Sequence, residues 1–348
     1  MAGRRTKSGE VTLAQVAAHA GVSAITASRV FRNPAIVSAG VRARVEEAVQ
    51  ALNYVPNMAA RALASTRTDV IGVIIPSVTN NVFADVLRGI YDASEGGSHI
   101  VQLGNTRYGL AEEERLLRIF QGQKPAGLIV AGIDQTADAR ATLEGMSCPI
   151  VQIMEIGPDP VDMMVGFSHR DAARAVTGHL LERGYRRIGF VGARMDPRTQ
   201  RRFEGFSEAL QARGLFDPRR IVTTVAASSV PLGGQLLSDL VAKAPDTDAV
   251  FCINDDLALG VLFECQRRLV DVPRQMGIAG FNDMDVMAAA VPTLTSVRTH
   301  RYEMGRQAIA MVKAAIAGKR PAEPVVDLGF ELMARQSTAG AGGALSGR

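Results

Sequence analysis

The sequence predicts an α/β protein with a small helix-turn-helix headpiece at the N-terminus, followed by two doubly wound parallel-sheet subdomains. The first supporting observation is the uneven charge. Residues 1–68 contain nine Lys or Arg and three Glu, a net charge of +6, while the whole 348-residue chain carries +4. The second observation is a set of three short helical patterns within residues 1–68. The third is an alternation of strand and helix patterns from Asp69 onward. A small basic segment on a nearly neutral body indicates a polyanion partner for that segment alone.

The composition excludes several classes of protein. With 47% hydrophobic and 21% charged residues, the chain is typical of globular proteins with two or three domains. No apolar segment follows the basic N-terminus and no run of 18 apolar residues occurs, so we expect a cytoplasmic protein without a membrane helix. Cys148, Cys252 and Cys265 are expected to be buried thiols. We find no zinc-ligand spacing, phosphate-binding loop or hydrolase motif, so we expect no catalytic site, cofactor or metal.

Residues 12–52 predict three short helices around a very small core. Thr12 and Gln15 form a capping box that begins the first helix, and Gly21 ends it because glycine accepts the left-handed conformation of a sharp turn. Ser23 begins the second helix and Ser38 the third. The residues expected to face the core are Leu13, Val16, Ala17, Ala20, Thr26, Val30, Val41, Val45, Ala48, Val49 and Leu52. This is the plan of a helix-turn-helix.

The second helix has an outward face without acidic residues. Its outward residues are Ala24, Ile25, Ser28 and Arg29. Any three-helix miniature domain with a solvated basic surface would show a similar pattern, and this alternative stays open at this point. Pro56 then breaks the chain before a short alanine-rich stretch.

From Asp69 the chain alternates between apolar strands and helices, which is typical of parallel sheets covered on both faces. The first half predicts strands at 69–76, 99–105, 126–132 and 148–154, with helices at 83–93, 111–121 and 136–144. The second half predicts strands at 186–192, 221–225, 248–254 and 277–281, with helices at 202–213, 233–244 and 255–268. Two such runs of similar length predict two doubly wound subdomains side by side.

The stretch TLAQVAAHAGVSAITASRVFRNPAIVSAGVRARVEEAVQALNYVPNMAARALAS, from Thr12 through Ser65, resembles the DNA-binding headpiece and hinge of the LacI/GalR transcriptional repressors. The likeness continues over the body in IGVIIPSVTNNVFADVLRGI, VGFSHRDAARA, HLLERGYRRIGFVGA, FCINDDLALG and GIAGFNDMD. Within that family the chain is similar to the gluconate-utilisation repressor group. The resemblance implies a periplasmic-binding-protein-like body with a ligand in the cleft between its subdomains.

By this resemblance the second helix lies in the major groove of operator DNA, and residues 57–64 form a hinge helix on the DNA. Arg29 is the best candidate for a bidentate contact to guanine, while Ala24 and Ile25 would read thymine methyl groups or DNA shape. Leu63 would enter the minor groove and kink the site, or else pack against the body. The other residues implied to contact phosphates or to belong to the hinge are Thr12, Ser23, Ser28, Asn33, Ser38 and Asn57.

The resemblance also implies domain boundaries. Residues 1–55 would form the headpiece, 56–68 the hinge helix, and 69–336 the effector-binding and dimerisation body. The chain would cross between subdomains near residues 167, 297 and 327, so that 69–167 joins 297–326 and 168–296 joins 327–336. The last residues, 337–348, are rich in Gly and Ala and lack apolar heptads, so we expect a disordered tail and a homodimer.

Polar residues gather where the expected strands end, which is where open α/β sheets bind ligands. By the resemblance, Arg202, Asn254 and Asn282 align with ligand-binding residues of the family, and Phe83 and Phe167 would stack on the apolar face of a sugar. The full set of candidate effector-binding residues is Ser77, Asn80, Phe83, Asn105, Arg107, Glu155, Phe167, Arg202, Asn254 and Asn282.

Simpler structural roles stay open for several of these residues. Ser77 and Asn80 would serve equally well as loop and cap residues. Asn254 or Asp255 would cap the helix that follows, and we expect Asp255 to do so. Arg202 lies among other charged residues and would fit a solvated charge run.

The charged residues predict the chemical class of the effector. Asn282 stands where the family often has aspartate, so it would repel an anion less, and Arg202 would attract one through charge-assisted hydrogen bonds. Glu155 would oppose an anion unless it points at hydroxyl groups or pairs with arginine. We therefore expect a sugar acid, gluconate or a close relative.

The sequence thus predicts a ligand-responsive repressor that binds a pseudo-palindromic operator in double-stranded DNA as a homodimer, with half-sites roughly one helical turn apart. The effector would reorient the subdomains and release the operator, although a corepressor that promotes binding stays open. Two other classes share the two-lobed body. A sugar-transport binding protein needs a secretory signal and no headpiece, and a sugar-phosphate enzyme would have to use Glu155 and Asp255 for acid–base chemistry.

Overall fold

The computed structural model describes residues 11–32, 36–55 and 68–340. The chain forms two compact units, residues 1–68 and 69–348. The predicted hinge helix, with Asn57 and Leu63, and the predicted phosphate contact Asn33 lie outside the described residues. Within the described ranges, no helix has the length and apolar character needed to cross a membrane.

The N-terminal unit contains three helices, α1 (Leu13–His19), α2 (Ala24–Arg32) and α3 (Ala39–Ala51). The predicted capping box is present: the Gln15 side chain accepts a hydrogen bond from the Thr12 backbone N–H at 2.8 Å, and the Thr12 hydroxyl accepts one from the Gln15 N–H. Gly21 follows α1 with a φ of +65°, the left-handed conformation that the turn requires. Ser23 then caps α2 by accepting from the Thr26 N–H at 3.1 Å.

This unit differs from the prediction at Thr26 in its core and at Ser38 before α3. Thr26 is only half-buried, because its hydroxyl bonds to that of Ser23 at 2.9 Å, and Ala27 takes the buried place instead. Ser38 precedes α3 as its N-cap, but its side chain makes no capping hydrogen bond. The buried core residues are Val16, Ala17, Ala20, Ala27, Val30, Val45 and Ala48.

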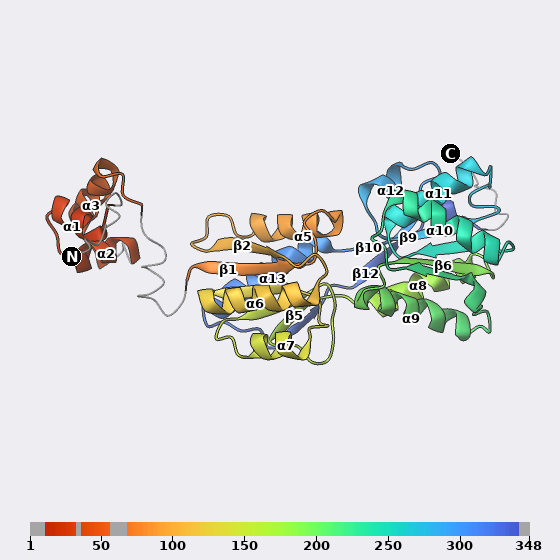
Figure 1. The fold of residues 1–348 in the computed structure, drawn as a ribbon, viewed down its shortest axis with the longest axis horizontal. Coiled ribbons are helices and arrows are strands. Elements are labelled where there is room, and N and C mark those ends of the chain that lie inside the picture. The colour runs from red at the N-terminus through yellow and green to blue at the C-terminus, as the bar shows by residue number, and fades with distance from the viewer. Residues whose placement is uncertain (1–10, 33–35, 56–67, 341–348) are drawn as a thin grey trace, which may run out of the picture. The chain divides into compact units, whose positions relative to one another are not determined.

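The second unit consists of two α/β lobes (Figure 1). Lobe 1 contains an all-parallel sheet with the strand order β11-β5-β4-β3-β1-β2. Its strands are β1 (Val70–Ile75), β2 (Ile100–Asn105), β3 (Gly127–Ala131), β4 (Ile150–Ile153), β5 (Met163–Gly166) and β11 (Val325–Asp327). Its helices are α5 (Asn81–Asp92), α6 (Leu110–Gln123), α7 (Ala137–Glu144) and α13 (Arg301–Ile316). Helices α5 and α13 pack on one face of the sheet, and α6 and α7 on the other.

Lobe 2 contains a second sheet with the order β12-β10-β9-β8-β6-β7, in which only β12 runs antiparallel to its neighbour. Its strands are β6 (Ile188–Ala193), β7 (Ile221–Thr224), β8 (Ala249–Cys252), β9 (Gly277–Asn282), β10 (Thr295–Thr299) and β12 (Phe330–Met333). Its α-helices are α8 (His169–Glu182), α9 (Pro197–Gln211), α10 (Val230–Lys243), α11 (Asp255–Arg267) and α12 (Asp285–Ala289). In β6, Gly189 faces Leu240 of α10 while Phe190 faces Phe206 of α9, so helices cover both faces of the sheet (Figure 1).

The chain passes between the lobes three times, after Gly166, after Thr299 and after Asp327. The second crossing comes later than the predicted residue 297. The reason is that β10 stays paired with β9 as far as Arg298 and with β12 as far as Thr299. Both lobes therefore include residues from the last part of the chain.

Glycines bring the covering helices into close contact. A Cβ on Gly205 of α9 would lie 2.0 Å from the carbonyl oxygen of Arg170 in α8. A Cβ on Gly305 of α13 would lie 2.0 Å from the carbonyl oxygen of Val86 in α5. A Cβ on Gly260 of α11 would lie 2.0 Å from the carbonyl oxygen of Val230, the first residue of α10. Because no side chain fits at these crossings, the helices pack backbone to backbone.

Residues 337–340 belong to lobe 2 and not to a disordered tail. Ser337 and Thr338 are buried in a 3₁₀ turn, η3 (Gln336–Thr338). The Ser337 hydroxyl donates to a carbonyl oxygen of β9 at 2.6 Å, and the Thr338 hydroxyl lies 2.8 Å from His179 Nε2. The composition predicted disorder, but buried hydrogen bonds to distant residues fix this segment. Residues 341–348 lie outside the described part.

Candidate nucleic-acid face and ligand cavity

Helix α2 exposes three of the residues predicted to read DNA. Ile25 is 67% exposed, Ala24 and Arg29 are exposed as well, and Ser28 is half-buried. This arrangement follows from helical periodicity, because Ala27 points into the core and leaves the opposite face of α2 to solvent.

The hydroxyl groups predicted to contact phosphates lie at the starts of the three helices. Thr12, Ser23 and Ser38 are all exposed. Thr12 and Ser23 also cap α1 and α2, whereas the Ser38 hydroxyl makes no capping bond. Backbone N–H groups at the start of a helix favour phosphate, so these positions suit contacts with a DNA backbone.

The body contains a cavity of about 230 Å³ lined by residues of both lobes. The lining comes from the segments that follow β1, β2 and β4 in lobe 1 and β6, β7, β8 and β9 in lobe 2, which is the carboxyl edge of each sheet. The structure brings six of the ten predicted effector-binding residues to this cavity: Ser77, Asn80, Phe83, Arg202, Asn254 and Asn282.

Arg202 of α9 is buried and held by several contacts. Its Nε donates to His169 Nδ1 at 3.1 Å, and its Nη1 donates to the carbonyl oxygen of Ile253. The guanidinium carbon lies 3.9 Å from the centre of the Phe281 ring. Its Nη2 makes no hydrogen bond with any residue that the structure describes, although Arg202 is only 8% exposed. Arg202 is therefore not part of a solvated charge run, and it offers the Nη2 group, with its two N–H donors, to the cavity.

His169 fixes the orientation of Arg202. The His169 Nε2 lies 2.9 Å from the Met154 carbonyl oxygen, which can only accept, so Nε2 carries the proton and Nδ1 accepts from Arg202. Burial, together with the charge of Arg202, holds the pKa of His169 well below its usual value, and the ring is neutral. Since His169 begins lobe 2 and Met154 follows β4 of lobe 1, these bonds join the two lobes.

The lobe 1 wall of the cavity is a connected set of polar side chains. Asn80 caps α5 by accepting from the Val82 N–H at 3.0 Å, and its amide donates to the Tyr108 hydroxyl at 3.1 Å. The Ser77 hydroxyl accepts from the Asn80 N–H at 3.1 Å. Ser77 and Asn80 thus have the structural roles left open above, and they also line the cavity. Phe83 lies beneath them, almost fully buried.

The cap of α11 is Asn254, which corrects the expectation for Asp255. The Asn254 Oδ1 accepts from the Leu257 N–H at 3.1 Å, and its Nδ2 donates to the Ser228 hydroxyl at 2.7 Å. The helix begins one residue earlier than a cap at Asp255 would allow, so the Asp255 carboxylate is turned away from the helix N-terminus. Asn254 and Ser228 together form part of the lobe 2 wall.

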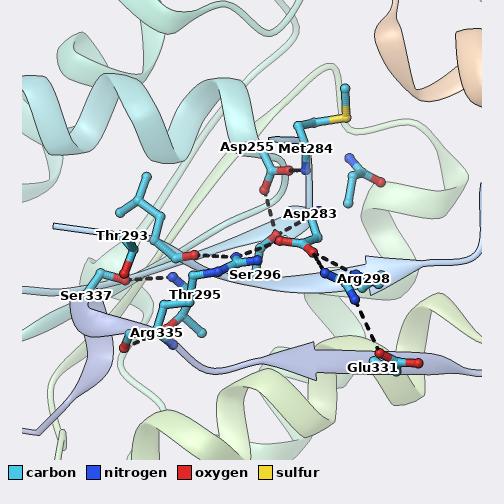
Figure 2. A network of polar contacts seen from close by, with 12 residues as sticks. Asp255, Asp283, Met284, Thr293, Thr295, Ser296, Arg298, Glu331, Arg335 and Ser337 are labelled. Atoms are coloured by element: carbon cyan, nitrogen blue, oxygen red, sulfur yellow. Dashed lines mark hydrogen bonds and ion pairs between the residues drawn. The ribbon is translucent and has the colours of Figure 1, made fainter. Parts of the chain in front are cut away.

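Asp255 instead belongs to a buried polar network in lobe 2 (Figure 2). The Ser296 hydroxyl and the Met284 N–H donate to its two carboxylate oxygens, each at 2.7 Å. Burial raises the pKa of Asp255 to about 7. Nearby, Asp283 forms ion pairs with Arg298 at 2.8 Å and Arg335 at 2.6 Å. Hydrogen bonds or ion pairs within the protein therefore occupy both carboxylates.

Four predicted residues, Asn105, Arg107, Glu155 and Phe167, do not line the cavity. Phe167 is buried against the His169 ring, with the ring centres 4.3 Å apart. Arg107 is exposed, because two successive residues with positive φ, Arg107 and Tyr108, turn Tyr108 toward the cavity in its place. Asn105 Oδ1 accepts from the Arg107 N–H at 3.3 Å and so serves this turn.

Glu155 lies behind the cavity wall. It is 2% exposed, its Oε1 accepts from the Ile156 N–H at 3.1 Å, and its Oε2 lies 3.7 Å from Arg201 Nε. Arg201 also forms an ion pair with Asp134 at 2.6 Å, which connects α9 of lobe 2 to lobe 1. Glu155 thus lies beside an arginine and outside the lining of the cavity, so it does not oppose an anion there.

Sequence reasoning missed five charged or aromatic residues of the cavity: Tyr108, Arg194, Asp196, Arg198 and Asp256. The Arg194 guanidinium carbon lies 4.0 Å from the centre of the Tyr108 ring, a cation–π contact between the lobes. Asp196 caps α9, with Pro197 at its first position. A capping Asp before Pro, directly after a predicted strand, is a helix-start signal that would have placed Arg198 in the first turn beside the ligand. Nothing in the sequence marked Tyr108.

The charged residues of the cavity are balanced in number. Arg194, Arg198 and Arg202 line it together with Asp196, Asp255 and Asp256. Burial lowers the pKa of Arg202 to about 10; Asp196 opposes this shift, and Arg198 adds to it. Arg202 remains charged at neutral pH, so the α9 wall, with Arg198 and Arg202, is the part of the cavity that suits an anion.

Two family descriptions match the chain. "Bacterial regulatory proteins, lacI family" matches residues 12–57, and "Periplasmic binding protein-like domain" matches residues 177–338. The first covers α1, α2 and α3, and the second covers most of lobe 2 together with the late segments of lobe 1.

Relatives of the chain include bacterial transcriptional regulators. The chain is 43% identical to HTH-type transcriptional regulator GntR of Pseudomonas aeruginosa over 95% of this chain and 96% of that protein. It is 36% identical to GntR of Escherichia coli strain K12, over 92% of this chain and 96% of that protein. It is 32% identical to IdnR of the same strain, over 92% of this chain and 97% of that protein. These relatives are named as regulators and not as enzymes, in agreement with the sequence prediction.

Solved structures have the same architecture. A LacI-family transcriptional regulator from Silicibacter pomeroyi superposes with a TM-score of 0.87 at 36% identity, covering 94% of this chain and 99% of that one. GntR from Chromobacterium violaceum superposes with a TM-score of 0.75 at 38% identity, covering 78% of this chain and 100% of that one. The match extends over both units and confirms the predicted α/β fold with its helix-turn-helix and periplasmic-binding-protein-like body. The protein belongs to the LacI family and is a DNA-binding transcriptional regulator.

Proposed function

We propose that this regulator is a cytoplasmic repressor that binds a pseudo-palindromic operator as a homodimer and releases it when a sugar acid such as gluconate enters the cavity. The observation that carries the proposal is buried Arg202, whose Nη2 makes no hydrogen bond with any described residue, in a cavity that Arg194 and Arg198 also line. A carboxylate is the group that best satisfies a buried guanidinium N–H. The relatives named GntR and the sequence resemblance to gluconate-utilisation repressors support the same class of effector.

The size and polarity of the cavity support a small, hydroxylated ligand. Its volume of about 230 Å³ is below the roughly 300–1,000 Å³ of sites for drug-sized ligands. Ser77, Ser228, Asn254 and Asn282 supply hydroxyl and amide groups around it. Such groups pair with sugar hydroxyls, while arginine pairs with an acid group.

On the DNA, Arg29 would donate two hydrogen bonds to a guanine, and Ala24 and Ile25 would contact thymine methyl groups. Two headpieces of a two-fold dimer would read half-sites roughly one helical turn apart. The exposure of these three residues on α2 supports this assignment.

Ligand binding would reach the headpiece through the orientation of the lobes. The chain passes between them three times, and the bonds from Met154 to His169 to Arg202 also join them beside the cavity. An effector that prefers one orientation shifts the population of DNA-binding dimers, typically by about 1–3 kcal/mol of coupling.

Calorimetric titration and gel shifts test the proposal together. Full-length protein is titrated with gluconate, ketogluconate, 6-phosphogluconate and neutral hexoses, and operator binding is measured with and without each ligand. We expect acids to bind and to weaken the operator complex. Binding of neutral sugars alone would overturn the sugar-acid assignment, and an acid that strengthens operator binding would make it a corepressor.

Deletion of residues 1–68 tests whether the N-terminal unit binds DNA and the second unit binds the ligand. Because residues 69–348 form a compact unit with its own core and the cavity, we expect this variant to bind ligand as the full chain does. It should bind no operator. Specific DNA binding by the deletion variant would contradict the role of α2.

A further inference from the structure

Arg198 and Arg202 lie one helical turn apart on α9 and both line the cavity. Residues four apart on a helix share one face, so the two guanidinium groups approach the same space. The Arg198 side chain is 13% exposed, and Arg202 is buried.

The two arginines differ in how their donors are used. Arg202 donates from Nε to His169 and from Nη1 to the carbonyl oxygen of Ile253, and its guanidinium stacks on the Phe281 ring. Arg198 has one ion pair, from Nη2 to Asp196 Oδ2 at 3.2 Å, and its Nε and Nη1 make no hydrogen bond with any described residue. Arg202 is therefore a structural anchor in which only the Nη2 nitrogen is left without a bond to a described residue, whereas in Arg198 both Nε and Nη1 are left so.

Asp196 fixes the position of Arg198 by pairing with its Nη2 alone. Its other oxygen, Oδ1, accepts from the Thr199 N–H at 2.9 Å as the cap of α9. The guanidinium carbon of Arg198 lies 5.7 Å from the centre of the Phe83 ring in lobe 1. A charged fork fixed on one side by a carboxylate and on the other by an aromatic face is preorganised, which reduces the entropy lost when a ligand binds.

The wall formed by the start of α11 has a different chemistry. Asn254 presents an amide, and Asp256 lines the cavity without a hydrogen bond or ion pair to any residue in the described ranges. A carboxylate there would repel an acid group and accept hydrogen bonds from hydroxyl groups.

We propose that Arg198 is the residue by which this regulator distinguishes a sugar acid from the neutral polyol of the same shape. The guanidinium of Arg198 and the Nη2 of Arg202 bind the ligand carboxylate together, and the hydroxyl chain runs toward Asn254 and Asp256. This inference rests on the proposed function, since it assumes that the cavity takes a sugar acid.

The balance of charge within the site supports this role. Burial lowers the pKa of Arg202, the charge of Asp196 opposes this shift, and the proximity of Arg198 adds to it, so two arginines and one carboxylate share a poorly solvated space. A bound carboxylate would balance the second arginine, whereas a neutral ligand would not.

The experiment compares gluconate with gluconamide, which has the same hydroxyl chain and no charge. Calorimetry on the full chain measures both ligands with wild type, Arg198→Gln, Arg198→Lys and Arg213→Gln. Arg213 is exposed just beyond the end of α9, so Arg213→Gln removes the same charge away from the cavity. Operator binding without ligand checks that each variant folds.

We expect Arg198→Gln to bind gluconate about ten- to a hundredfold more weakly, the loss typical of a hydrogen bond to a charged group, while gluconamide affinity stays within about threefold. Arg198→Lys should recover part of the gluconate affinity, because it keeps the charge but not the fork. Arg213→Gln should match wild type.

Equal weakening of both ligands by Arg198→Gln would overturn the inference, because Arg198 would then shape the cavity and not read the charge. Unchanged gluconate binding by this variant would overturn it as well. If wild type binds neither ligand but binds a neutral hexose, the proposed function itself is wrong, whatever the variants do.

Discussion

Glu155 should make the stability of the body depend on pH in a way that one substitution removes. Its carboxyl group is 2% exposed, and its Oε2 has an arginine at 3.7 Å but no hydrogen-bond partner among the described residues. Burial raises the pKa of Glu155 from 4.5 to about 7. The folded state therefore favours the protonated carboxyl, and ionising it destabilises the fold. We expect Glu155→Gln, which keeps the shape and cannot ionise, to remove this effect.

The sign and size of the effect follow from the two pKa values. A carboxyl whose pKa is higher in the folded than in the unfolded state binds more protons when folded, so the free energy of unfolding falls as pH rises. The fall begins near pH 4.5 and is complete above about pH 7. At about 1.4 kcal/mol for each pH unit between the two pKa values, Glu155 destabilises the protein by about 3 kcal/mol at pH 8 relative to pH 4.

Urea unfolding of wild type and Glu155→Gln at pH 5, 6, 7 and 8 measures this contribution. Asp255 and Glu113, whose pKa values burial also raises to about 7, titrate in both proteins and cancel in the difference. We expect the wild type to lose stability relative to the variant by 2 to 3 kcal/mol, as an order of magnitude, between pH 5 and 8. Parallel pH curves for the two proteins would refute the reasoning, since Glu155 would then be ionised at no cost.

Three further changes have expected outcomes. Gly205→Ala should lower the free energy of unfolding by about 1–3 kcal/mol, because its Cβ would clash with a backbone carbonyl of α8, while Gly178→Ala, with open space around it, should be neutral or stabilising in the same urea titration. Thr338→Val should cost about 1–3 kcal/mol by leaving His179 without its buried partner, and an unchanged melting temperature would argue that residues 337–340 do not secure lobe 2. Arg29→Ala should weaken operator binding by about 1–3 kcal/mol and relax the preference at one base pair; equal weakening on all sequences in a binding-site selection would show that Arg29 contacts only phosphates.

The local signals in the sequence predicted the elements well. Thr12 and Gln15 form the expected capping box because this motif depends only on residues three apart. The rule that ligands bind at strand ends found Ser77 and Asn80 for the same reason, since it needs only the order of strands and loops, whereas Arg202 came from the family resemblance. The rule does not give the direction of a side chain. Arg107 and Tyr108 are neighbours in the sequence, and only the positive φ values of the turn place Tyr108, not Arg107, at the cavity.

The predictions that the structure corrected concern residues whose partners lie far away in the sequence. The composition of residues 337–340 predicted disorder, but their partners are in α8 and β9, far away in the sequence. Glu155 was predicted to belong to the ligand site, but it lies behind the cavity wall, and the arginine beside it, Arg201, comes from the other lobe. The assignment of Asp255 as a cap failed because Ser296 and Met284 compete for its carboxylate, and neither lies near it in the chain.

The three crossings between lobes also set the order in which a newly made chain can fold. Helices α1–α3 need only residues up to the early fifties, whereas lobe 1 lacks α13 and β11 until residue 327 has been made and lobe 2 lacks β12 and η3 until residue 338. Long-range pairings of this kind slow folding. The growing chain can therefore complete its DNA-reading unit on the ribosome well before either lobe of the sensing unit, and the two lobes finish almost together.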